Sequence, residues 1–412
     1  MTKKSLLKVS TILGTRPEII RLSRVIPLLD RFTDHIFVHT GQNYDYELNE
    51  IFFKDLELRK PDYFLNVDTS SLGAAVGDII RKSEEVLMKE KPGAMLVLGD
   101  TNSCLAAYMA KRMHIPIFHM EAGNRCFDEN VPEETNRRII DHIADFNLVY
   151  TEHARRHLLS EGIPHRRIYL TGSPMKEVLD YYKPKIEASK ILQNISIGFP
   201  QNPSPTTHQS PVTSHQSLSP KSYFMVSVHR EENVDNPENL ARILSILNDL
   251  ADKHKMPVIV STHPRTRKRM EELLNNQSRV TRHPSPVTSN PLIQFLKPFA
   301  FTDYIHLQQH AACTISDSGT ISEESAILSF PAISLRNSME RPEAQDSGTI
   351  ILTGFDRARV LNGIEIAMSE HKSRTYHNPV ADYSVTDTSW RVLKLIQGLS
   401  GLSNRWSGIN GG

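Results

Sequence analysis

Short apolar segments, each followed by polar residues, recur along the N-terminal half of the chain. The segments KVSTILG, IFVHTG, AMLVLG and IPIFHM lead to Arg16, Asn43, Asp100 and Glu121, respectively. Apolar runs of this length predict buried strands. A segment of helix-like composition follows each run, as at Pro17–Leu29 and Asn102–Arg112. Strands that alternate with helices predict a parallel, doubly wound sheet.

The C-terminal half repeats this alternation with different residues. YFMVSV leads to His229 and Arg230, PVIVST leads to His263, and CTISDSG leads to the helix-like SEESAILS. We therefore expect an α/β protein with two Rossmann-like doubly wound domains. The length of 412 residues fits two domains, because a single core rarely grows beyond about 250–300 residues. Ligands bind at the carboxyl ends of such strands, so the expected active site lies in the interdomain cleft.

We place the domain boundary near Lys185, after the TGSP turn and the helix-like segment Met175–Tyr182. The N-terminal domain then covers residues 1–185 and the C-terminal domain covers residues 186–384. The last residues, 401–412, have the composition of an unstructured tail.

Two stretches rich in proline and serine interrupt the C-terminal domain, near 198–221 and 276–290. Their few apolar residues predict disordered or extended insertions. The first contains HQSPVTS followed by a second HQS, and SPVTS recurs in the second stretch. The alternative function for these stretches is a Pro-rich ligand for a partner domain.

The charge balance argues against two classes of partner. The chain has 48 basic and 47 acidic residues, so it offers no electrostatic basis for binding nucleic acid or an anionic membrane. No segment reaches about 18–20 consecutive apolar residues, so we expect no membrane span. The three cysteines are too scattered for a disulfide framework or a zinc knuckle, and a reducing cytoplasm is the simplest location.

Two turns of the N-terminal half are candidate binding sites. GTRPEIIRLS places Arg16 and Arg21 around a helix N-terminus, which suits a phosphate or carboxylate, although Arg16 could equally be solvated beside an ordinary turn. GDTNS offers Asp100 as a functional carboxylate, but Asp and Thr are also good helix caps, so this turn on its own favours the capping role.

The C-terminal half offers a second anion site. In DSGTISEES, Ser318, Gly319 and Thr320 can present backbone amides and hydroxyls to phosphate, and Glu324 lies one turn further, where a carboxylate can bind ribose hydroxyls. The alternative is a plain helix cap. His229, beside Arg230 at a strand end, is better placed for a diphosphate than for a core.

The sequence excludes three common site types by their spacing. No His pair has HExxH spacing and no Cys/His set has zinc-ligand spacing, so we expect no metal. GxGxxG is absent after the first strand, and GxxxxGK[ST] is absent throughout. A nicotinamide dehydrogenase and a P-loop NTPase therefore lose support.

Taken in order along the chain, the motifs resemble those of the non-hydrolysing UDP-N-acetylglucosamine 2-epimerases. The motifs are GTRPEIIRL, HTGQNYD, LGDTNS, HMEAGNR, PEETNRR, TGSP, SVHREEN, THPR, SDSGTISEE and ERPEAQDSGT. The resemblance implies a glycosyltransferase-B-like fold with the nucleotide held mainly by the C-terminal domain. It also implies that a final helix, residues 385–400, packs back on the N-terminal domain.

The family's chemistry is elimination of UDP to a glycal followed by re-addition, which needs no cofactor. EIIRLS, MEAGNRCFDENVPEE and SDSGTISEE are closest to the UDP-N-acetyl-L-fucosamine synthase subgroup, which acts on UDP-2-acetamido-2,6-dideoxy-L-talose. The implied product would serve surface polysaccharide synthesis. The alternatives are UDP-N-acetylglucosamine as substrate, a UDP-sugar glycosyltransferase on the same scaffold, and a nucleotide-sugar binding protein without activity.

Matching motifs carry the family's roles onto individual residues. The resemblance implies acid/base or other catalytic roles for Asp100, Glu121, Glu133, Arg137 and His229. It implies substrate or nucleotide contacts for Arg16, Arg21, Tyr304, Ser318, Gly319 and Glu324, with Tyr304 near uracil. Two residues depart from the family's pattern: Arg21 replaces a lysine, and Thr320 replaces the second glycine of SGG. We also expect a homodimer, with a UDP-sugar as the small-molecule partner.

Overall fold

The computed structural model describes residues 6–41, 46–199, 214–280, 290–373 and 380–409. The chain forms two compact units. The first comprises Met1–Tyr181, Glu340–Glu343 and Ala381–Gly412, and the second comprises Tyr182–Met339 and Ala344–Val380. Each unit is built on its own parallel sheet, which confirms the predicted α/β class with two doubly wound domains.

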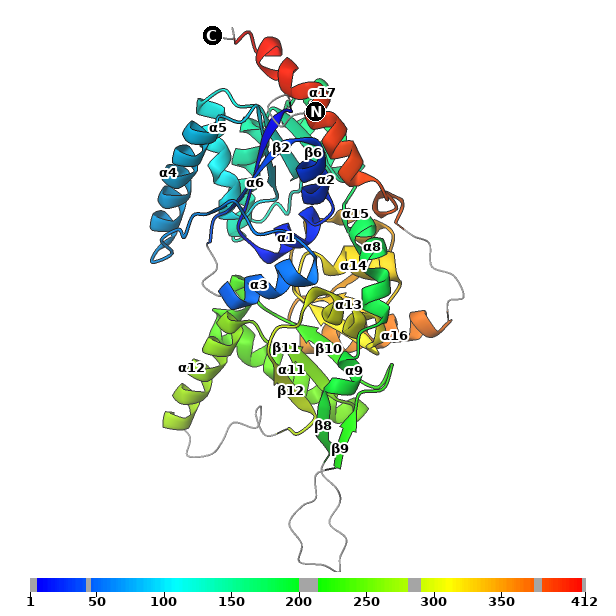
Figure 1. The fold of residues 1–412 in the computed structure, drawn as a ribbon. Helices are drawn as coiled ribbons and strands as arrows, with labels where there is room; N and C mark the ends of the chain where they lie inside the picture. Colours follow the sequence, from blue (N-terminus) through cyan, green and yellow to red (C-terminus); the bar gives the residue numbers. More distant parts are fainter. Residues whose placement is uncertain (1–5, 42–45, 200–213, 281–289, 374–379, 410–412) are drawn as a thin grey trace, which may run out of the picture. The chain divides into compact units, whose positions relative to one another are not determined.

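The first unit contains a seven-stranded sheet in the order β3-β2-β1-β4-β5-β6-β7, in which every neighbouring pair is parallel (Figure 1). The strands are β1 (Lys8–Leu13), β2 (Asp34–His39), β3 (Tyr63–Phe64), β4 (Ala94–Leu98), β5 (Ile117–Ala122), β6 (Phe146–Val149) and β7 (Ile168–Leu170). The strand order reverses between β1 and β4. In a doubly wound sheet, ligands bind beyond the carboxyl ends of the strands at this switch point.

Helices follow the strands of the first unit as the alternation predicts. They are α1 (Arg16–Leu22), α2 (Val25–Phe32), α3 (Tyr46–Asp55), α4 (Leu72–Glu90), η2 (Asn102–Ala106), α5 (Ala107–Arg112), α6 (Pro132–Ile143), α7 (Glu152–Ser160), η3 (His165–Arg167) and α8 (Met175–Glu187), whose end lies in the second unit. Buried side chains of β1 and β4, such as Ile12 and Val97, pack against Ile79, Ala110 and Ile140 of the covering helices.

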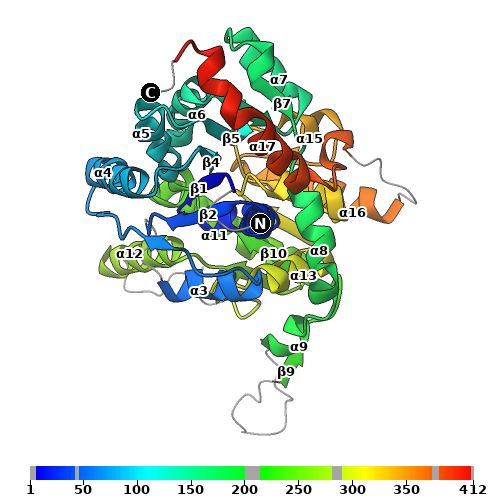
Figure 2. The ribbon, with the colours of Figure 1, turned by 45° about the horizontal axis from the view of Figure 1, so that its top comes forward.

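The last helix, α17 (Thr388–Trp406), packs on α2 of the first unit (Figure 1 and Figure 2). The ring of Trp390 lies 5.5 Å from that of Phe32. The helix continues to Trp406, although the sequence favours its end near residue 400. Trp406 explains the extra length, because its ring lies 6.0 Å from that of Phe146 in the core sheet.

The second unit contains a six-stranded parallel sheet in the order β12-β11-β10-β13-β14-β15. The strands are β10 (Phe224–Ser227), β11 (Val258–Ser261), β12 (Ile293–Leu296), β13 (Cys313–Ser316), β14 (Ala332–Ser334) and β15 (Ile351–Leu352). The order reverses between β10 and β13. The turns that follow these two strands contain His229 and Ser318.

Helices surround this second sheet and close its core. They are α9 (Ile191–Asn194), α10 (Glu231–Val234), α11 (Pro237–His254), α12 (Pro264–Val280), α13 (Phe301–His310), α14 (Ile321–Leu328), α15 (Pro342–Asp346), whose first two residues belong to the first unit, and α16 (Arg357–Ser373). The short helix η5 (Ala381–Tyr383), which precedes α17, belongs to the first unit. Buried Phe224 and Ile315 of the sheet pack with Leu247 of α11 and Ile364 of α16.

Part of the first Pro/Ser-rich stretch is ordered. Strand β8 (Ser196–Phe199) pairs with β9 (Ser214–Ser217) in an antiparallel ribbon. The buried side chains of Ile197 and Leu218 join the same apolar cluster as Tyr223, so apolar residues at the ends of the stretch anchor it. Residues 200–213 of the first stretch and 281–289 of the second lie outside the described residues. Residues 276–280, predicted to be disordered or extended, instead form the end of α12 (Pro264–Val280).

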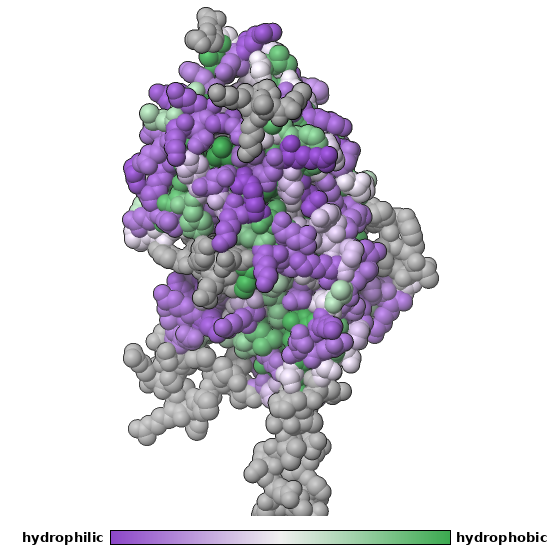
Figure 3. All heavy atoms as spheres, in the orientation of Figure 1, coloured by the Kyte–Doolittle hydropathy of each residue, from purple (hydrophilic) through white to green (hydrophobic). Residues whose placement is uncertain are grey.

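Hydrophilic residues predominate on the face drawn in Figure 3. Among the described residues, no helix combines the length and the apolar composition needed to cross a membrane.

Candidate active site

Glu18 joins the two turns at the switch point of the first sheet. Its buried carboxylate accepts hydrogen bonds from the Thr15 amide (2.7 Å) and from the hydroxyls of Thr101 (3.2 Å) and Ser103 (2.5 Å). Burial raises the pKa of Glu18, although these donors oppose the shift. Glu18 therefore ties the β1 turn to the β4 turn and fixes the N-terminus of α1 as a capping box.

Glu121 lies at the carboxyl end of β5 in a strained backbone conformation. The strand register shifts between Met120 and Ala122, and Glu121 itself has a φ of 66°. A non-glycine residue in this left-handed region costs about 1–3 kcal/mol and is frequent at functional sites. The bulge turns the Glu121 side chain toward two guanidinium groups.

The Glu121 carboxylate is held from two sides. Arg21 of α1 donates to Oε2, and Arg341 donates to Oε1. The side-chain Nδ2 of Asn124 also donates to Oε1 (3.3 Å). Arg341 belongs to the first unit although most of its sequence neighbours belong to the second. The structure thus brings the predicted residues Arg21 and Glu121 together and adds Arg341.

Arg137 is the centre of a second charged cluster. Its Nε donates to Asp100 Oδ2 (2.6 Å), Nη1 donates to Glu134 Oε2 (3.0 Å), and Nη2 donates to Glu340 Oε1 (2.9 Å). Burial opposes the charge, yet the carboxylates of Asp100 and Glu340 hold the pKa of Arg137 well above its usual value. Nη1 also lies 3.4 Å from Cys126 Sγ.

Three residues of these clusters were not singled out from the sequence. Glu134, Glu340 and Arg341 contact the predicted residues directly, whereas Glu133 is half-buried in the first turn of α6. The position of Glu134 could have been deduced, because residues i and i+3 share a helix face and Arg137 is three residues on. Glu340 and Arg341 open the motif ERPEAQDSGT, but nothing in that motif indicates that Arg137 and Glu121 are their partners.

The other predicted residue of the first unit, Arg16, starts α1. Its guanidinium lies 5.4 Å from the centre of the Phe52 ring, a distance at which a cation and an aromatic face attract. Because Arg16 and Arg21 lie on the same short helix, Glu18 positions both of them through the capping box.

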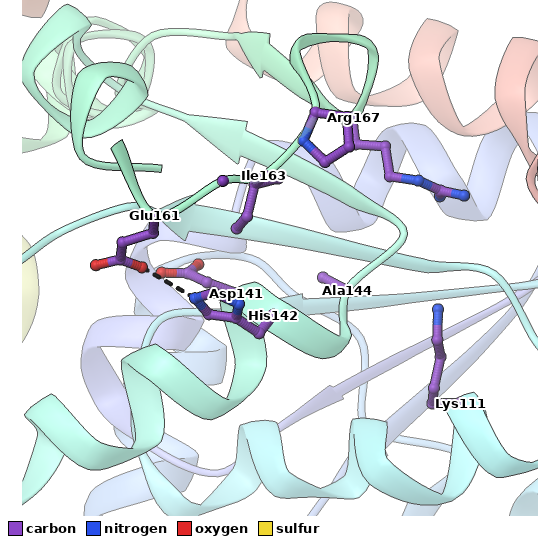
Figure 4. A pocket seen from close by; sticks show the side chains of 9 residues that line it. Lys111, Asp141, His142, Ala144, Glu161, Ile163 and Arg167 are labelled. Carbon is purple, nitrogen blue, oxygen red and sulfur yellow. Dashed lines mark hydrogen bonds and ion pairs between the residues drawn. The ribbon is translucent and has the colours of Figure 1, made fainter. Parts of the chain in front are cut away.

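A buried network supports β5 behind Glu121. Asp141 accepts hydrogen bonds from Arg125 Nη1 (2.7 Å) and the Gly123 amide (3.1 Å), and lies 2.9 Å from His119 Nδ1. A recess of about 290 Å³ borders this network, and Figure 4 shows His142 and Glu161 facing each other in its wall. None of the predicted site residues lines the recess.

In the second unit, the turns after β10 and β13 meet at Asp317. Its buried carboxylate accepts hydrogen bonds from the backbone amides of His229 (3.0 Å) and Arg230 (2.9 Å) and from Asn233 Nδ2 (2.8 Å). The His229 ring lies beside it, 6.3 Å from the ring of His263. The predicted histidine is therefore held next to the predicted phosphate loop.

The loop of Ser318, Gly319 and Thr320 leads into α14. The hydroxyls of Ser318 and Thr320 lie 3.0 Å apart. Thr320 has φ −80° and ψ −18°, an ordinary right-handed conformation. The backbone at this position therefore does not require glycine, and the replacement of the family's second glycine by threonine is compatible with the loop.

Glu324 and Tyr304 lie close together in the second unit. The buried Glu324 carboxylate accepts a hydrogen bond from Gln308 Nε2 (2.9 Å). Burial, and then the nearby charge of Glu324, raises the pKa of Tyr304. Tyr304 is half-buried and packs beside the cluster of Tyr223 and Met225.

The arrangement provides carboxylates paired with guanidinium groups in the first unit and an amide-rich loop with a histidine in the second. Among the described residues, no group of three His, Cys, Asp or Glu side chains is placed to hold a metal ion. Carboxylates can transfer protons, and amides with basic groups can hold a diphosphate.

Comparison with known proteins agrees with this chemistry. The family model for UDP-N-acetylglucosamine 2-epimerase matches residues 29–397. A UDP-N-acetylglucosamine 2-epimerase of Methanococcus maripaludis is 36% identical over 379 residues, which cover 91% of this chain and 95% of the relative.

Two solved structures are similar over almost the whole chain. UDP-N-acetylglucosamine 2-epimerase from Rickettsia bellii is 44% identical, with a TM-score of 0.84, and covers 98% of this chain and 100% of its own. The Methanocaldococcus jannaschii enzyme in complex with UDP-GlcNAc and UDP is 32% identical, with a TM-score of 0.81, and covers 95% and 99%.

Proposed function

The chain belongs to the UDP-N-acetylglucosamine 2-epimerase family, and we propose that it inverts C2 of a UDP-linked N-acetylamino sugar by elimination and re-addition of UDP. The observation that carries the proposal is the pairing of Asp100 and Glu121 with guanidinium groups at the carboxyl edge of the first sheet. Carboxylates held in this way are suited to proton transfer in a fixed geometry.

The proposed mechanism follows from the position of the reacting hydrogen. C2 of the sugar is not adjacent to a carbonyl, so direct deprotonation gives no stabilised carbanion. Instead, a base removes the C2 proton while the bond from C1 to the UDP oxygen breaks, and the electrons of the C–H bond form the C1–C2 double bond. UDP then attacks C1 of this glycal, and an acid on the opposite face protonates C2.

The roles in this mechanism are distributed over the two sets of residues. Asp100, Glu121 and Glu133 are the proposed acid/base groups, with the identity of the base left open. Arg137 orients Asp100, since the two side chains are 2.6 Å apart. His229 completes the proposed catalytic set by contacting the departing diphosphate.

We assign the nucleotide to the second unit and the N-terminal arginines. Ser318 and Gly319 would bind phosphate through amide and hydroxyl groups, and Glu324 would bind the ribose. Arg16 and Arg21 would add positive charge for the diphosphate, and the half-buried ring of Tyr304 would flank uracil.

The proposed substrate is UDP-2-acetamido-2,6-dideoxy-L-talose, with UDP-N-acetyl-L-fucosamine as product for surface polysaccharide synthesis. The variants EIIRLS and SDSGTISEE support this substrate. The names of the relatives favour the alternative, UDP-N-acetylglucosamine converted to UDP-N-acetylmannosamine.

Incubation with each UDP-sugar in deuterated water tests the activity. Deuterium at C2 of both epimers is the expected result, because the proton removed from C2 exchanges with solvent before it is returned. Transfer of the sugar to an acceptor would instead indicate a glycosyltransferase. UDP-sugar binding without exchange would contradict the epimerase proposal.

We further propose that the protein is a homodimer in a reducing cytoplasm. Support for the dimer comes from exposed apolar side chains on three neighbouring helices: Met88 of α4, Tyr108 of α5 and Ile139 of α6. Large apolar side chains that are exposed on adjacent helices are candidates for a protein interface. Sedimentation analysis should therefore show a dimer that Tyr108→Lys weakens, and a monomeric wild-type protein would contradict the proposal.

A further inference from the structure

Asp317 is a buried carboxylate to which the proposed reaction assigns no role. It follows β13 directly and precedes Ser318, and its side chain has 0% exposure. Strands β10 and β13 are paired so that Ser227 lies opposite Ser316, and the Asp317 amide donates to the Ser227 carbonyl (3.2 Å). The topology therefore places Asp317 between the His229 turn and the phosphate loop.

The Asp317 carboxylate accepts hydrogen bonds from one short segment, residues 229–233. The amides of His229 and Arg230 and the side chain of Asn233 donate to it at 2.8 to 3.1 Å. A buried charge of this kind is tolerated only when several donors satisfy it. These three groups are enough to explain Asp317 as a purely structural residue.

The His229 ring makes a fourth contact with the Asp317 carboxylate. The buried carboxylate does not need this contact, because the three donors already satisfy it. Its Nδ1 lies 3.2 Å from Asp317 Oδ1, and 41% of the His229 side chain is exposed. Within the described ranges, no hydrogen bond is found for either ring nitrogen, so Nδ1 meets the carboxylate as a close ion-pair contact and Nε2 has no such contact. An ionised carboxylate only accepts hydrogen bonds, so the ring that faces it carries its proton on Nδ1 and presents Nε2 outward.

We propose that Asp317 is a positioning residue for His229, which selects the tautomer and orientation in which Nε2 meets the substrate. This inference rests on the proposed function, in which His229 contacts the departing diphosphate. The same carboxylate holds the backbone of the His229 turn beside Ser318. One buried group thereby couples the orientation of the histidine to the loop proposed to bind phosphate.

A double-mutant cycle separates positioning from structural support. We compare the turnover number of Asp317→Asn with that of wild type. We also compare the turnover number of the double variant, which carries Asp317→Asn and His229→Gln, with that of His229→Gln alone. If Asp317 acts through the ring, Asp317→Asn should lower turnover by about 10²-fold or more in wild type, which is within the range for acid/base groups. In the His229→Gln background the further loss should be below about 3-fold, because groups that act as a unit are not additive.

Equal losses in both backgrounds would overturn the proposal and leave Asp317 as support for the turn. Asn233→Ala serves as the matched structural control, since it removes one donor to Asp317 Oδ2 without touching the ring. We expect it to lose clearly less turnover than Asp317→Asn. A loss as large as that of Asp317→Asn would also count against positioning.

A measurement on the unmodified protein keeps the proposal testable if Asp317→Asn does not fold. The ¹⁵N chemical shifts of the His229 ring distinguish the two neutral tautomers, and the proposal requires the proton on Nδ1. A proton on Nε2 in the neutral ring would refute it. Absence of C2 exchange in wild type would instead refute the proposed function, so the two failures are distinguishable.

Discussion

At the scale of single residues, the charged side chains at the candidate site of the first unit form specific ion pairs. Glu121 contacts Arg21 and Arg341, and Asp100 contacts Arg137. Each oxygen of Glu121 is held by a different arginine, and Asp100 Oδ2 is held by Arg137 Nε, so charge-assisted hydrogen bonds fix the direction of both carboxylates. We therefore expect substitutions of the carboxylates to affect turnover before they affect nucleotide binding.

Asp100→Asn and Glu121→Gln should each lower turnover by about 10²–10⁴-fold, the usual contribution of a positioned acid or base. UDP affinity, measured by calorimetry, should change little in both variants. Glu324→Ala should show the opposite pattern, with weaker UDP binding. Asp180→Asn and Glu85→Gln are matched controls, since both carboxylates pair with neighbouring helix residues at exposed positions. Near-normal turnover of Asp100→Asn and Glu121→Gln would remove both from the catalytic set.

His39 provides a pH-dependent prediction. Its buried ring accepts a hydrogen bond from the Gly41 amide and stacks on Phe64, and burial lowers its pKa from 6.5 to about 4. The unfolded chain therefore binds a proton near pH 6.5 while the folded chain does not. The free energy of unfolding should fall as the pH drops from 6.5 toward 4, by about 1.4 kcal/mol for each pH unit.

Chemical denaturation at several pH values checks this expectation. His39→Gln keeps an acceptor for the Gly41 amide but does not titrate in this range, so its stability should depend less on pH than that of wild type. Parallel pH curves for the two proteins would show that His39 is not the group responsible.

At the scale of elements, the sequence predicted seven strands of the two sheets and missed the other six, β3, β6, β7, β12, β14 and β15, as well as the helix breaks. Each apolar run became a parallel strand with its polar residues at the carboxyl end, because a buried strand needs a continuous apolar segment. The expected helix Pro17–Leu29 instead divides into α1 and α2 around Ser23, and Asn102–Arg112 begins as a 3₁₀ turn, η2. Both segments have continuous helix-like composition, so these breaks depend on tertiary packing.

The β8 and β9 ribbon was missed for a different reason. The strand Ser214–Ser217 contains only polar residues, so it has no apolar periodicity to detect. It forms because Phe199 and Ser214 pair across the ribbon and because Leu218 is buried next to it. Pairing with a neighbour, rather than local preference, makes this segment a strand.

The pairing gives a direct test of the insertion. Replacing residues 200–213 by Asn-Gly would join Phe199 to Ser214 through a two-residue hairpin turn. We expect the melting temperature and the turnover number to stay close to those of wild type, because the shorter connection preserves the pairing of Phe199 with Ser214. Deleting 200–218 instead would also remove buried Leu218 and should destabilise the second unit. Loss of activity on the Asn-Gly replacement would show that the removed residues contribute to function.

At the scale of the whole molecule, the sequence predicted two sheets but not how the chain is shared between the units. Glu340 and Arg341 belong to the first unit, where they contact Arg137 and Glu121. About 200 residues separate each pair along the chain, so no periodic pattern or local motif links them. Contacts of this separation depend on the complete fold, which is why the candidate site could be predicted only in part.

The substrate is also a property of the whole molecule, because the sugar must fit a pocket assembled from distant segments. If the sugar is a 6-deoxy compound, its pocket has no polar partner at C6. A hydroxyl at C6 would then be buried without a hydrogen bond, at a cost of about 1–3 kcal/mol. Each 1.4 kcal/mol corresponds to a tenfold difference, so kcat/KM should be about 5- to 140-fold higher for UDP-2-acetamido-2,6-dideoxy-L-talose than for UDP-N-acetylglucosamine. Measuring both constants on one enzyme preparation checks this ratio. A higher value for UDP-N-acetylglucosamine would refute the 6-deoxy substrate and leave the C2 epimerase proposal intact.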